Sequence, residues 1–247
     1  MIEIKKPTLN KHVLIKYNDS IKSRWTARHS FSSKLASSTR LDFILNIGSY
    51  NGWLESALFS CGRQNIASID VEQENIRKAK EAAPHANFVV ASGVNLPFRE
   101  HAFQLITMYE VIEHISKGRE KNCLGECNRV LLDGGMLLLS TPFNALRSKL
   151  LDPAWYLGHR HYSASQLNFV GRKTGFVPRK IYIRGGLFEQ FTMILLYVFK
   201  NFGLEVPFKT WFERYRLSEY EQKGFSTLFI VFEKQYESIL SKRLRSE

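Results

Sequence analysis

The sequence predicts an α/β fold built on a doubly wound, parallel sheet. Short apolar runs alternate with amphipathic stretches from Leu41 onward, which is the order of a repeated strand–helix unit. The apolar runs are continuous rather than alternating with polar residues, as in strands that helices cover on both faces. With 247 residues and 44% apolar content, the chain is long enough to bury one substantial core.

The strand–helix alternation is clearest in the first half of the chain. Strands are predicted at 43–47, 66–70, 88–91, 103–109 and 136–141. Helices are predicted between them at 52–60, 73–83 and 118–131, and Pro84 ends the second of these helices.

The rhythm changes beyond Pro142. A loop rich in aromatic and basic residues, 152–162, precedes a helix at 163–174, for which Ser163 is the expected N-cap. A strand at 177–183, an apolar helix at 187–202 and an irregular basic and aromatic stretch then lead to a terminal strand at 226–233. At the other end of the chain, the Ser/Thr cluster over 30–39 is predicted to be a loop.

The net charge of +12 is unevenly placed. Residues 1–40 carry nine Lys/Arg against two acids, residues 41–150 carry eleven against twelve, and residues 151–247 carry fifteen against nine. The flanking segments therefore supply the whole excess, which favours an anionic substrate, an anionic membrane surface or nucleic acid. Solvated surface lysines are the alternative interpretation.

Cysteine use and hydropathy narrow the class of protein. Cys61, Cys123 and Cys127 are an odd number without His/Cys partners at zinc spacing, so we predict reduced thiols and no metal site. The N-terminus has no apolar segment typical of a signal peptide. The most apolar segment, 190–199, is about half the length that spans a bilayer. We expect a cytoplasmic protein, with peripheral membrane contact left open.

A glycine-bracketed turn follows the first predicted strand. It is contained in NIGSYNG, 46–52, and the second predicted strand ends in a carboxylate, Asp70. A strand that stops at Gly and restarts as a helix gives a backbone loop that can lie flat against a nucleoside. The two features together predict a nucleotide-like cofactor across the tips of two parallel strands.

Five ordered pieces extend this pattern: NIGSYNG (46–52), SID (68–70), NLPF (95–98), FQLITMYEVIEHI (103–115) and RVLLDGGMLLLSTPF (129–143). With them the chain resembles class I S-adenosylmethionine (SAM)-dependent methyltransferases, in particular the ubiquinone/menaquinone-biosynthesis type. The resemblance is dense over 41–143 and looser from His159 onward. A Rossmann dehydrogenase would share only the first two pieces.

The resemblance implies a Rossmann-like sheet of seven strands, mostly parallel with an antiparallel C-terminal strand. It also implies two parts: a basic helical and loop extension over 1–40, and a methyltransferase domain over 41–247 with a substrate-side insertion around 184–224. The cofactor would be SAM, and the implied cofactor-binding residues are Asn46, Gly48, Tyr50, Gly52, Asp70, Val71, Ser92, Gly93, Tyr109 and Glu110.

Each implied role has a physical reason. Gly48 and Gly52 would let the backbone approach the methionine and ribose, and Asp70 would accept hydrogen bonds from both ribose hydroxyls. Asp70 could instead cap the following helix. Ser92 and Gly93 would face the adenine edge, and Tyr109 and Glu110 would lie near the methyl donor.

The chain also departs from the family pattern. Asn46 replaces the usual acid before the loop, Tyr50 the middle glycine, Ser92 the adenine-binding aspartate and Gln104 the aspartate of the Phe-Asp pair. A Tyr50 ring would crowd a position where backbone normally touches the ligand. Asn46 can hydrogen-bond but cannot pair electrostatically with the amino group of SAM.

His159, His161 and Glu110 are the candidate catalytic bases for an oxygen or carbon acceptor. This family commonly places a basic and aromatic segment such as 159–162 over the active site, so His159, His161 and Tyr162 are alternatively lid or substrate contacts. His114 orders its loop more readily than it catalyses, and Glu110 and Glu113 could be solvated helix residues.

The function implied is transfer of a methyl group to a small or lipid-like acceptor, with O- or C-methylation favoured over N-methylation, and an anionic acceptor is left open. A non-catalytic SAM-fold binding or scaffold protein is the main alternative. RNA methylation is disfavoured because no base-amine motif or RNA-binding module is present. The apolar helix at 187–202 could line a tunnel, lie on an anionic membrane, pack as core or form a homodimer face.

Overall fold

The computed structural model describes residues 27–156, 158–201 and 209–236. Within them a seven-stranded sheet has the order β3-β2-β1-β4-β5-β7-β6. Strand β7 is antiparallel to both of its neighbours, β5 and β6, and the pairs from β3 to β5 are parallel. The predicted fold class is therefore confirmed, including the antiparallel C-terminal strand.

The strands are β1 (Ile44–Ile47), β2 (Ile66–Asp70), β3 (Asn87–Val90), β4 (Phe103–Tyr109), β5 (Leu131–Pro142), β6 (Phe176–Arg184) and β7 (Thr227–Lys234). The helices are α2 (Ala27–Ser37), α3 (Trp53–Ser60), α4 (Gln73–Ala82), α5 (Glu120–Val130), α6 (Leu146–Leu151), α7 (Pro153–Tyr156), α8 (Ala164–Lys173), α9 (Leu187–Asn201) and α10 (Lys209–Glu221).

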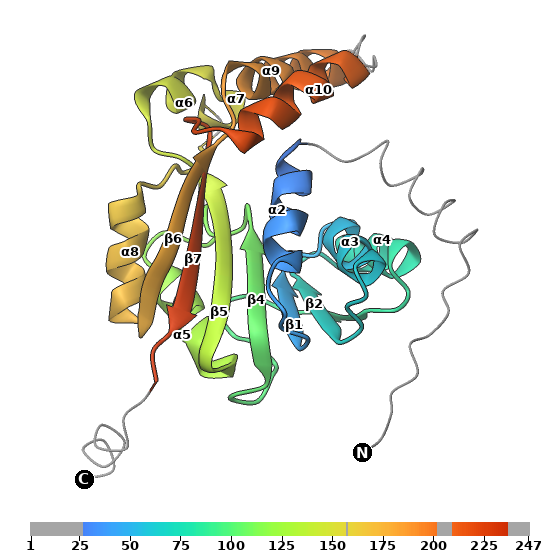
Figure 1. Ribbon diagram of the computed structural model, residues 1–247, viewed down its shortest axis with the longest axis vertical. Coiled ribbons are helices and arrows are strands. Elements are labelled where there is room, and N and C mark those ends of the chain that lie inside the picture. The colour runs from blue at the N-terminus through green and yellow to red at the C-terminus, as the bar shows by residue number, and fades with distance from the viewer. Residues whose placement is uncertain (1–26, 157, 202–208, 237–247) are drawn as a thin grey trace.

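Helices cover both faces of the sheet, with α5 and α8 on one side and α2, α3 and α4 on the other (Figure 1). Alternate strand residues serve the two faces, as the pleat requires. Leu45 and Ile47 of β1 join the core that α5 and α8 close, whereas Ile44 joins the core that α2 and α3 close. The continuous apolar runs are thus explained by burial on both sides. Cys123 and Cys127 lie buried in the first of these cores.

The predicted loop over 30–39 is wrong, because most of it forms helix α2. Ser32, Ser33 and Ala36 are buried against the sheet, and their small side chains let the helix pack closely. The serine hydroxyls find acceptors inside the helix, as in the bond from Ser37 Oγ to the Ser33 carbonyl at 2.7 Å. Tertiary packing here overrides the turn preference of serine. Residues 1–26 of the predicted extension lie outside the described residues.

The second half of the chain holds more helix than predicted. Helices α6 and α7 occupy 146–156, and α10 occupies much of a stretch predicted to be irregular. Helix α8 begins as predicted after Ser163, whose side chain forms a reciprocal capping box with Gln166. Helices α6, α7, α9 and α10 gather beyond one end of the sheet (Figure 1), and α9 contacts the other three.

Candidate active site

A cavity of about 780 Å³ opens at the carboxyl ends of the parallel strands. Its wall includes the residues that follow β1, β2, β3, β4 and β5, together with side chains from α2 and α9. The strand order reverses between β1 and β4, and a doubly wound sheet binds ligands at such a switch point. Its volume is in the range of pockets that enclose drug-sized ligands.

The loop after β1 forms one side of the cavity. Gly48 has a φ of 87°, and a Cβ there would lie 2.4 Å from Val111 Cγ2, so the position requires glycine. Its N–H bonds the Ile69 carbonyl at 2.8 Å, which ties the loop to the end of β2. Gly52 has a φ of 78° but does not line the cavity; a Cβ there would lie 2.9 Å from the Ala79 carbonyl oxygen. Gly52 therefore allows α3 and α4 to pack closely.

Tyr50 adopts the left-handed conformation, with a φ of 47°, that a glycine would occupy more easily. Its side chain borders the cavity but is 59% exposed, so most of the ring lies in solvent. Its backbone N–H donates to Asp70 Oδ2 at 2.9 Å. The side chain that was expected to crowd the ligand instead lies at the rim.

Asp70 ends β2 with its carboxylate at the cavity wall. Besides the Tyr50 N–H, it accepts the Glu72 N–H at 3.0 Å and the Asn75 side-chain amide at 3.1 Å, both on Oδ1. The N-cap of α4 is Glu72, so Asp70 orders the start of this helix without being its cap residue. Two carboxylate oxygens offer about four acceptor sites, so three donors leave one site open.

Asn46 does not line the cavity. It lies on the same face of β1 as Ile44, beneath α3, because alternate strand residues point to opposite faces. Its side chain donates to Glu55 Oε1 at 2.7 Å and accepts from Thr107 Oγ1 at 2.9 Å. Burial raises the pKa of Glu55, although hydrogen bonds from Ser68 and Asn46 oppose the rise. Asn46 thus belongs to a buried polar network and lies outside the cavity wall, where it was expected.

The remaining predicted cofactor contacts lie together on the cavity wall. Val71, Ser92 and Gly93 follow β2 and β3 along one side. A Cβ on Gly93 would lie 3.2 Å from Ile47 Cγ2 and 3.3 Å from Cys123 Sγ, so glycine lets this turn pack closely on β1 and α5. Tyr109 and Glu110 follow at the end of β4 on the other side.

Glu110 is held in place by two donors. Arg28 Nη1 of α2 lies 2.5 Å from Glu110 Oε2, and Ser140 Oγ donates to Oε1 at 2.7 Å. Tyr109 donates its hydroxyl to the Ser32 carbonyl, so α2 is fastened to the end of β4 by two side chains. The pKa of Arg28 is raised by the charge of Glu110, although burial opposes that rise. Arg28 was not predicted as a site residue, because most of α2, residues 30–37, was predicted to be a loop.

The two histidines that were predicted as bases, His159 and His161, lie in different surroundings. His159 lines the cavity, where its ring meets His114 edge to face at 4.7 Å between centroids. His161 does not line the cavity, since its side chain is buried between Phe143 and Asp152. Its Nδ1 lies 3.2 Å from the Phe143 carbonyl oxygen and its Nε2 lies 3.0 Å from Asp152 Oδ2. His161 therefore orients Asp152, which does line the cavity.

Arg160 and Tyr162 attach this segment to the loop after β4 and to Glu120 of α5. Arg160 bonds the carbonyls of Ile112, Glu113 and Ile115 and the Glu120 carboxylate. Tyr162 donates its hydroxyl to Glu120 Oε1 at 2.9 Å and packs against the core. These two residues hold the loop after β4, and neither lines the cavity.

Two titratable groups on the wall are tuned by burial. Burial raises the pKa of Glu113, and the nearby charge of Glu110 raises it further. Burial lowers the pKa of His114, and His159 lowers it further. The wall thus carries an imidazole whose pKa is lowered and a carboxyl group whose pKa is raised, beside the Glu110–Arg28 ion pair. In the described part of the chain, no group of three His, Cys, Asp or Glu side chains is arranged to hold a metal ion.

A small recess of about 30 Å³ adjoins the main cavity under α9. The two share Arg28, Glu110 and Asp152, so the recess continues the cavity next to these residues. We call this part of the site the acceptor side. Gln190 lines the recess, and its buried Oε1 has no hydrogen-bond partner among the described residues. The recess therefore presents acceptor oxygens to a group that can donate hydrogen bonds.

Comparisons with known proteins agree with this geometry. A family model described as a methyltransferase domain matches residues 45–139. Two proteins of Mycobacterium tuberculosis, from strains CDC 1551 / Oshkosh and H37Rv, are named as probable S-adenosylmethionine-dependent methyltransferases. Each is 24% identical over 162 residues, which cover 64% of this chain and 57% of the relative. The chain thus spans little more than half the length of these curated relatives.

Solved structures share the fold. The [4+2]-cyclase SpnF aligns with a TM-score of 0.63 and 19% identity, over 85% of this chain and 81% of that one. The N-methyltransferase NodS from Bradyrhizobium japonicum, solved with S-adenosylhomocysteine (SAH), aligns with a TM-score of 0.56 and 16% identity, over 85% and 86%. The chain is thus similar to a methyltransferase domain over residues 45–139 and to probable SAM-dependent methyltransferases, and it shares the fold of these solved structures.

Proposed function

We propose that this chain binds SAM in the 780 Å³ cavity and transfers its methyl group to a small or lipid-like acceptor. The observation that carries the proposal is the placement of Asp70 and Gly48 on one wall, at the ends of β1 and β2. The Asp70 carboxylate can accept hydrogen bonds from both ribose hydroxyls of SAM. The backbone at Gly48, which carries no side chain, leaves room for the methionine part of the cofactor.

The residues present fit the cofactor in chemistry and shape. Asp70 has one acceptor site open, and the Asn75 amide is the one of its three donors that belongs to a side chain. A ribose would use the open site and replace Asn75, whose side chain can rotate away. Ile47, Ile69 and Val94 supply an apolar wall for the adenine ring. When bound, SAM supplies an electrophilic methyl group on a positively charged sulfur.

The acceptor side is formed by groups that position a polar atom. Glu110 borders both the cavity and the recess, and its two donors fix the direction of its carboxylate. For an oxygen or carbon acceptor, Glu110 or His159 would take the proton that leaves the acceptor. His161 would act through Asp152 as a positioning residue, in place of the base role expected from the sequence. Closure by α2 and α9 would exclude water from the methyl transfer.

The assignment to the ubiquinone/menaquinone-biosynthesis type is supported by the sequence motifs alone, whereas the preference for an oxygen acceptor also draws on the site. Acceptor oxygens from Glu110, Asp152 and Gln190 favour an acceptor that carries a hydroxyl group. A hydroxyl can donate to one of these oxygens while its own oxygen faces the methyl group. An anionic group would meet the Glu110 and Asp152 carboxylates there, with Arg28 as a single opposing charge.

Calorimetric titration with SAH tests the cofactor site. We expect Asp70→Asn to weaken SAH binding by about tenfold or more, because a buried carboxylate that accepts hydroxyl donors is lost. The matched control is Asp42→Asn, since Asp42 precedes β1 at the opposite edge of the sheet and pairs with Arg63. No heat of binding with folded wild-type protein at millimolar SAH, or equal affinities for Asp70→Asn and wild type, would contradict the proposal.

Catalysis is separated from binding by a second readout. Folded protein incubated with SAM and a panel of phenols, polyols and hydroxylated lipids should release SAH with at least one acceptor. Glu110→Gln should lower that rate by about a hundredfold while changing SAH affinity little. Tight SAH binding without turnover on any acceptor would favour the non-catalytic SAM-fold alternative.

A further inference from the structure

Helix α9 leaves part of its apolar surface uncovered. Among its described side chains, the fully buried ones are polar (Glu189, Gln190 and Thr192), and the half-buried ones are apolar (Phe188, Met193, Ile194, Leu195 and Phe199). The exposed ones are also apolar, with Leu187, Phe191 and Val198 spaced along one stripe. A surface helix normally buries its apolar stripe, so an outward stripe indicates a surface that something else covers.

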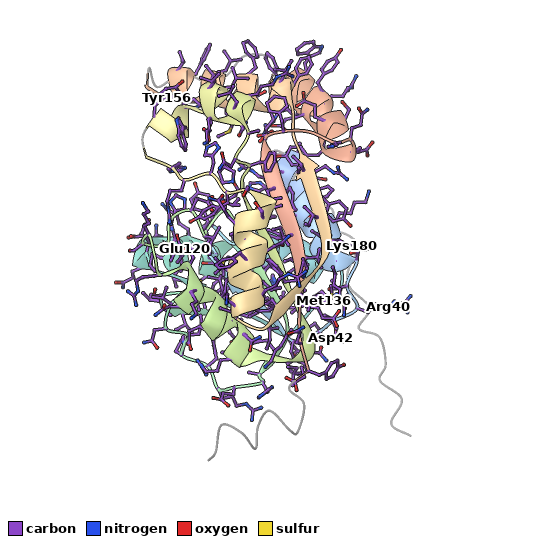
Figure 2. The ribbon with its side chains drawn as sticks, turned by 90° about the vertical axis from the view of Figure 1, so that its left-hand side faces the viewer. Arg40, Asp42, Glu120, Met136, Tyr156 and Lys180 are labelled. Atoms are coloured by element: carbon purple, nitrogen blue, oxygen red, sulfur yellow. The ribbon has the colours of Figure 1, made fainter. Side chains whose placement is uncertain are left out.

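The neighbouring helices extend this apolar stripe into a surface. Ten of the nineteen large hydrophobic side chains exposed in the described ranges belong to α6, α7, α9 and α10: Leu146, Leu150, Trp155, Tyr156, Leu187, Phe191, Val198, Trp211, Tyr215 and Leu217. We call these ten residues the apolar face. Figure 2 shows side chains projecting outward from the four helices, with Tyr156 at the edge of that end of the molecule.

Aromatic rings hold the α9 and α10 part of this face together. Phe188 stacks on Tyr215 with centroids 4.9 Å apart, and Trp211 packs on Tyr215 at 4.6 Å. Lys149 Nζ of α6 lies 4.7 Å from the ring centroid of Trp155 on α7. Trp and Tyr rings beside Lys and Arg are typical of groups that sit at the level of lipid headgroups.

The charged side chains of these four helices differ in depth. Three acids turn inward: Glu189 and Glu213 pair with buried Arg216, and Glu219 accepts three backbone N–H groups at the start of α9. Among the described side chains, Arg147 on α6 and Arg214 on α10 are exposed cations, and Glu221 at the end of α10 is an exposed acid. An apolar surface bordered by outward cations complements an anionic bilayer.

We propose that the apolar face docks on an anionic membrane surface. No helix in the described part of the chain is long and apolar enough to cross a bilayer, so the contact would be peripheral. Met193 of α9 and Asp152, between α6 and α7, line the cavity, so the docked surface would adjoin the acceptor side of the site. Entry of a lipid acceptor by this route rests on the proposed function, whereas membrane docking does not.

Flotation with vesicles of phosphatidylcholine, with and without phosphatidylserine, tests the docking. Wild-type protein should float with the phosphatidylserine vesicles at low salt and less with the neutral ones. Phe191→Ser should weaken partition by about tenfold, because the exposed half of a Phe side chain would no longer be buried in lipid. Arg147→Gln should weaken it by about fivefold.

Matched controls on α8 remove the same chemistry elsewhere. Phe169→Ser changes a Phe that is 65% exposed, against 51% for Phe191, and Arg172→Gln removes an exposed Arg. Both controls should float like wild type, and every variant should keep wild-type SAH affinity and melting temperature. Loss of SAH binding with docking intact would overturn the proposed function and leave the docking proposal standing.

Four outcomes would overturn the docking proposal. Wild-type protein could stay unbound with phosphatidylserine vesicles, or Phe191→Ser and Phe169→Ser could float equally. A dimer in light scattering that Phe191→Ser dissociates, without any vesicle binding, would show that a second copy covers the apolar face. A fall in melting temperature for Phe191→Ser alone, with vesicle binding unchanged, would show that the chain itself covers it.

Discussion

Asn46→Asp restores the acid that the resembled family carries before its cofactor loop, yet we expect it to destabilise this protein. Asn46 Nδ2 donates to Glu55 Oε1 at 2.7 Å, and both side chains are buried. The substitution places a second carboxylate oxygen at that distance from the first. A hydrogen bond to a charged group is worth about 1.5–3 kcal/mol, and repulsion between two buried acids adds to its loss. We expect a loss of about 3 kcal/mol at neutral pH, or about 6–12 °C in Tm for a chain of this size.

The loss should grow with pH. Burial already raises the pKa of Glu55 above its ordinary value of 4.5. A group with a raised pKa stabilises the fold fully below its unfolded pKa, and this contribution is lost as pH rises through the folded pKa. An acid at position 46 raises the pKa of Glu55 further. The stability of Asn46→Asp should therefore fall more steeply than that of wild type as pH rises above about 4.5.

Urea denaturation followed by circular dichroism, from pH 4.5 to neutrality, measures both effects. Gln104→Glu is the matched control, because its side-chain oxygen accepts from the backbone N–H groups of Asp42 and Phe43, with no carboxylate among these partners. The double variant Asn46→Asp/Glu55→Gln restores an amide–acid pair and should recover most of the loss. Wild-type stability and wild-type pH dependence in Asn46→Asp would refute this reasoning.

Gly52→Ala should cost about 2–4 kcal/mol in thermal unfolding, because its φ is 78° and the added Cβ would lie 2.9 Å from the Ala79 carbonyl oxygen. Gly62→Ala, with a φ of 85° but no heavy atom of the described residues within 4 Å of the added Cβ, should cost clearly less, and equal losses would contradict the packing argument. Burial alone would raise the pKa of Glu189, but Arg216 and then Arg28 lower it below its ordinary value of 4.5. Its stabilisation is therefore present above pH 4.5 and lost as pH falls through the folded pKa, so Glu189→Gln should cost about 3–5 kcal/mol at neutral pH and progressively less in acid. A cost independent of pH in urea denaturation would contradict this assignment.

The sheet could be predicted from the sequence because burial on both faces leaves a direct mark on the residues. Continuous apolar runs such as 43–47 and 226–233 are typical of strands that are covered on both sides, and they match β1 and β7 to within one residue at each end. Helices α2 and α10 were harder to predict, because their stability comes from tertiary contacts rather than from a regular apolar period. Buried Arg216 of α10 pairs with Glu189 and Glu213, which no local pattern reveals.

The cofactor side of the site could be predicted further than the acceptor side. Gly48 and Asp70 follow strands, and the ends of parallel strands meet at one edge of the sheet. Strand alternation could have placed Asn46 on the face of Ile44, away from the cavity. His159 and His161 are two residues apart and would share a face in a regular strand, but the segment is irregular and the side chains diverge.

Arg28 and Gln190 reach the acceptor side from helices distant in sequence, so only the tertiary structure brings them to Glu110. Residue type and spacing along the sequence do not indicate such tertiary contacts. The apolar face could be predicted in part, since the sequence of 187–202 is apolar. That this helix turns its polar side chains inward became visible only from their buried partners.

A crystal structure with SAH bound tests the central claim most directly. We predict that the ribose hydroxyls lie about 3 Å from the Asp70 carboxylate, that the Asn75 amide has moved away from Oδ1, and that the adenine ring contacts Ser92 and Gly93. A nucleoside bound elsewhere, or one that leaves the Asp70–Asn75 bond in place and makes no contact with the loop after β1, would contradict the account.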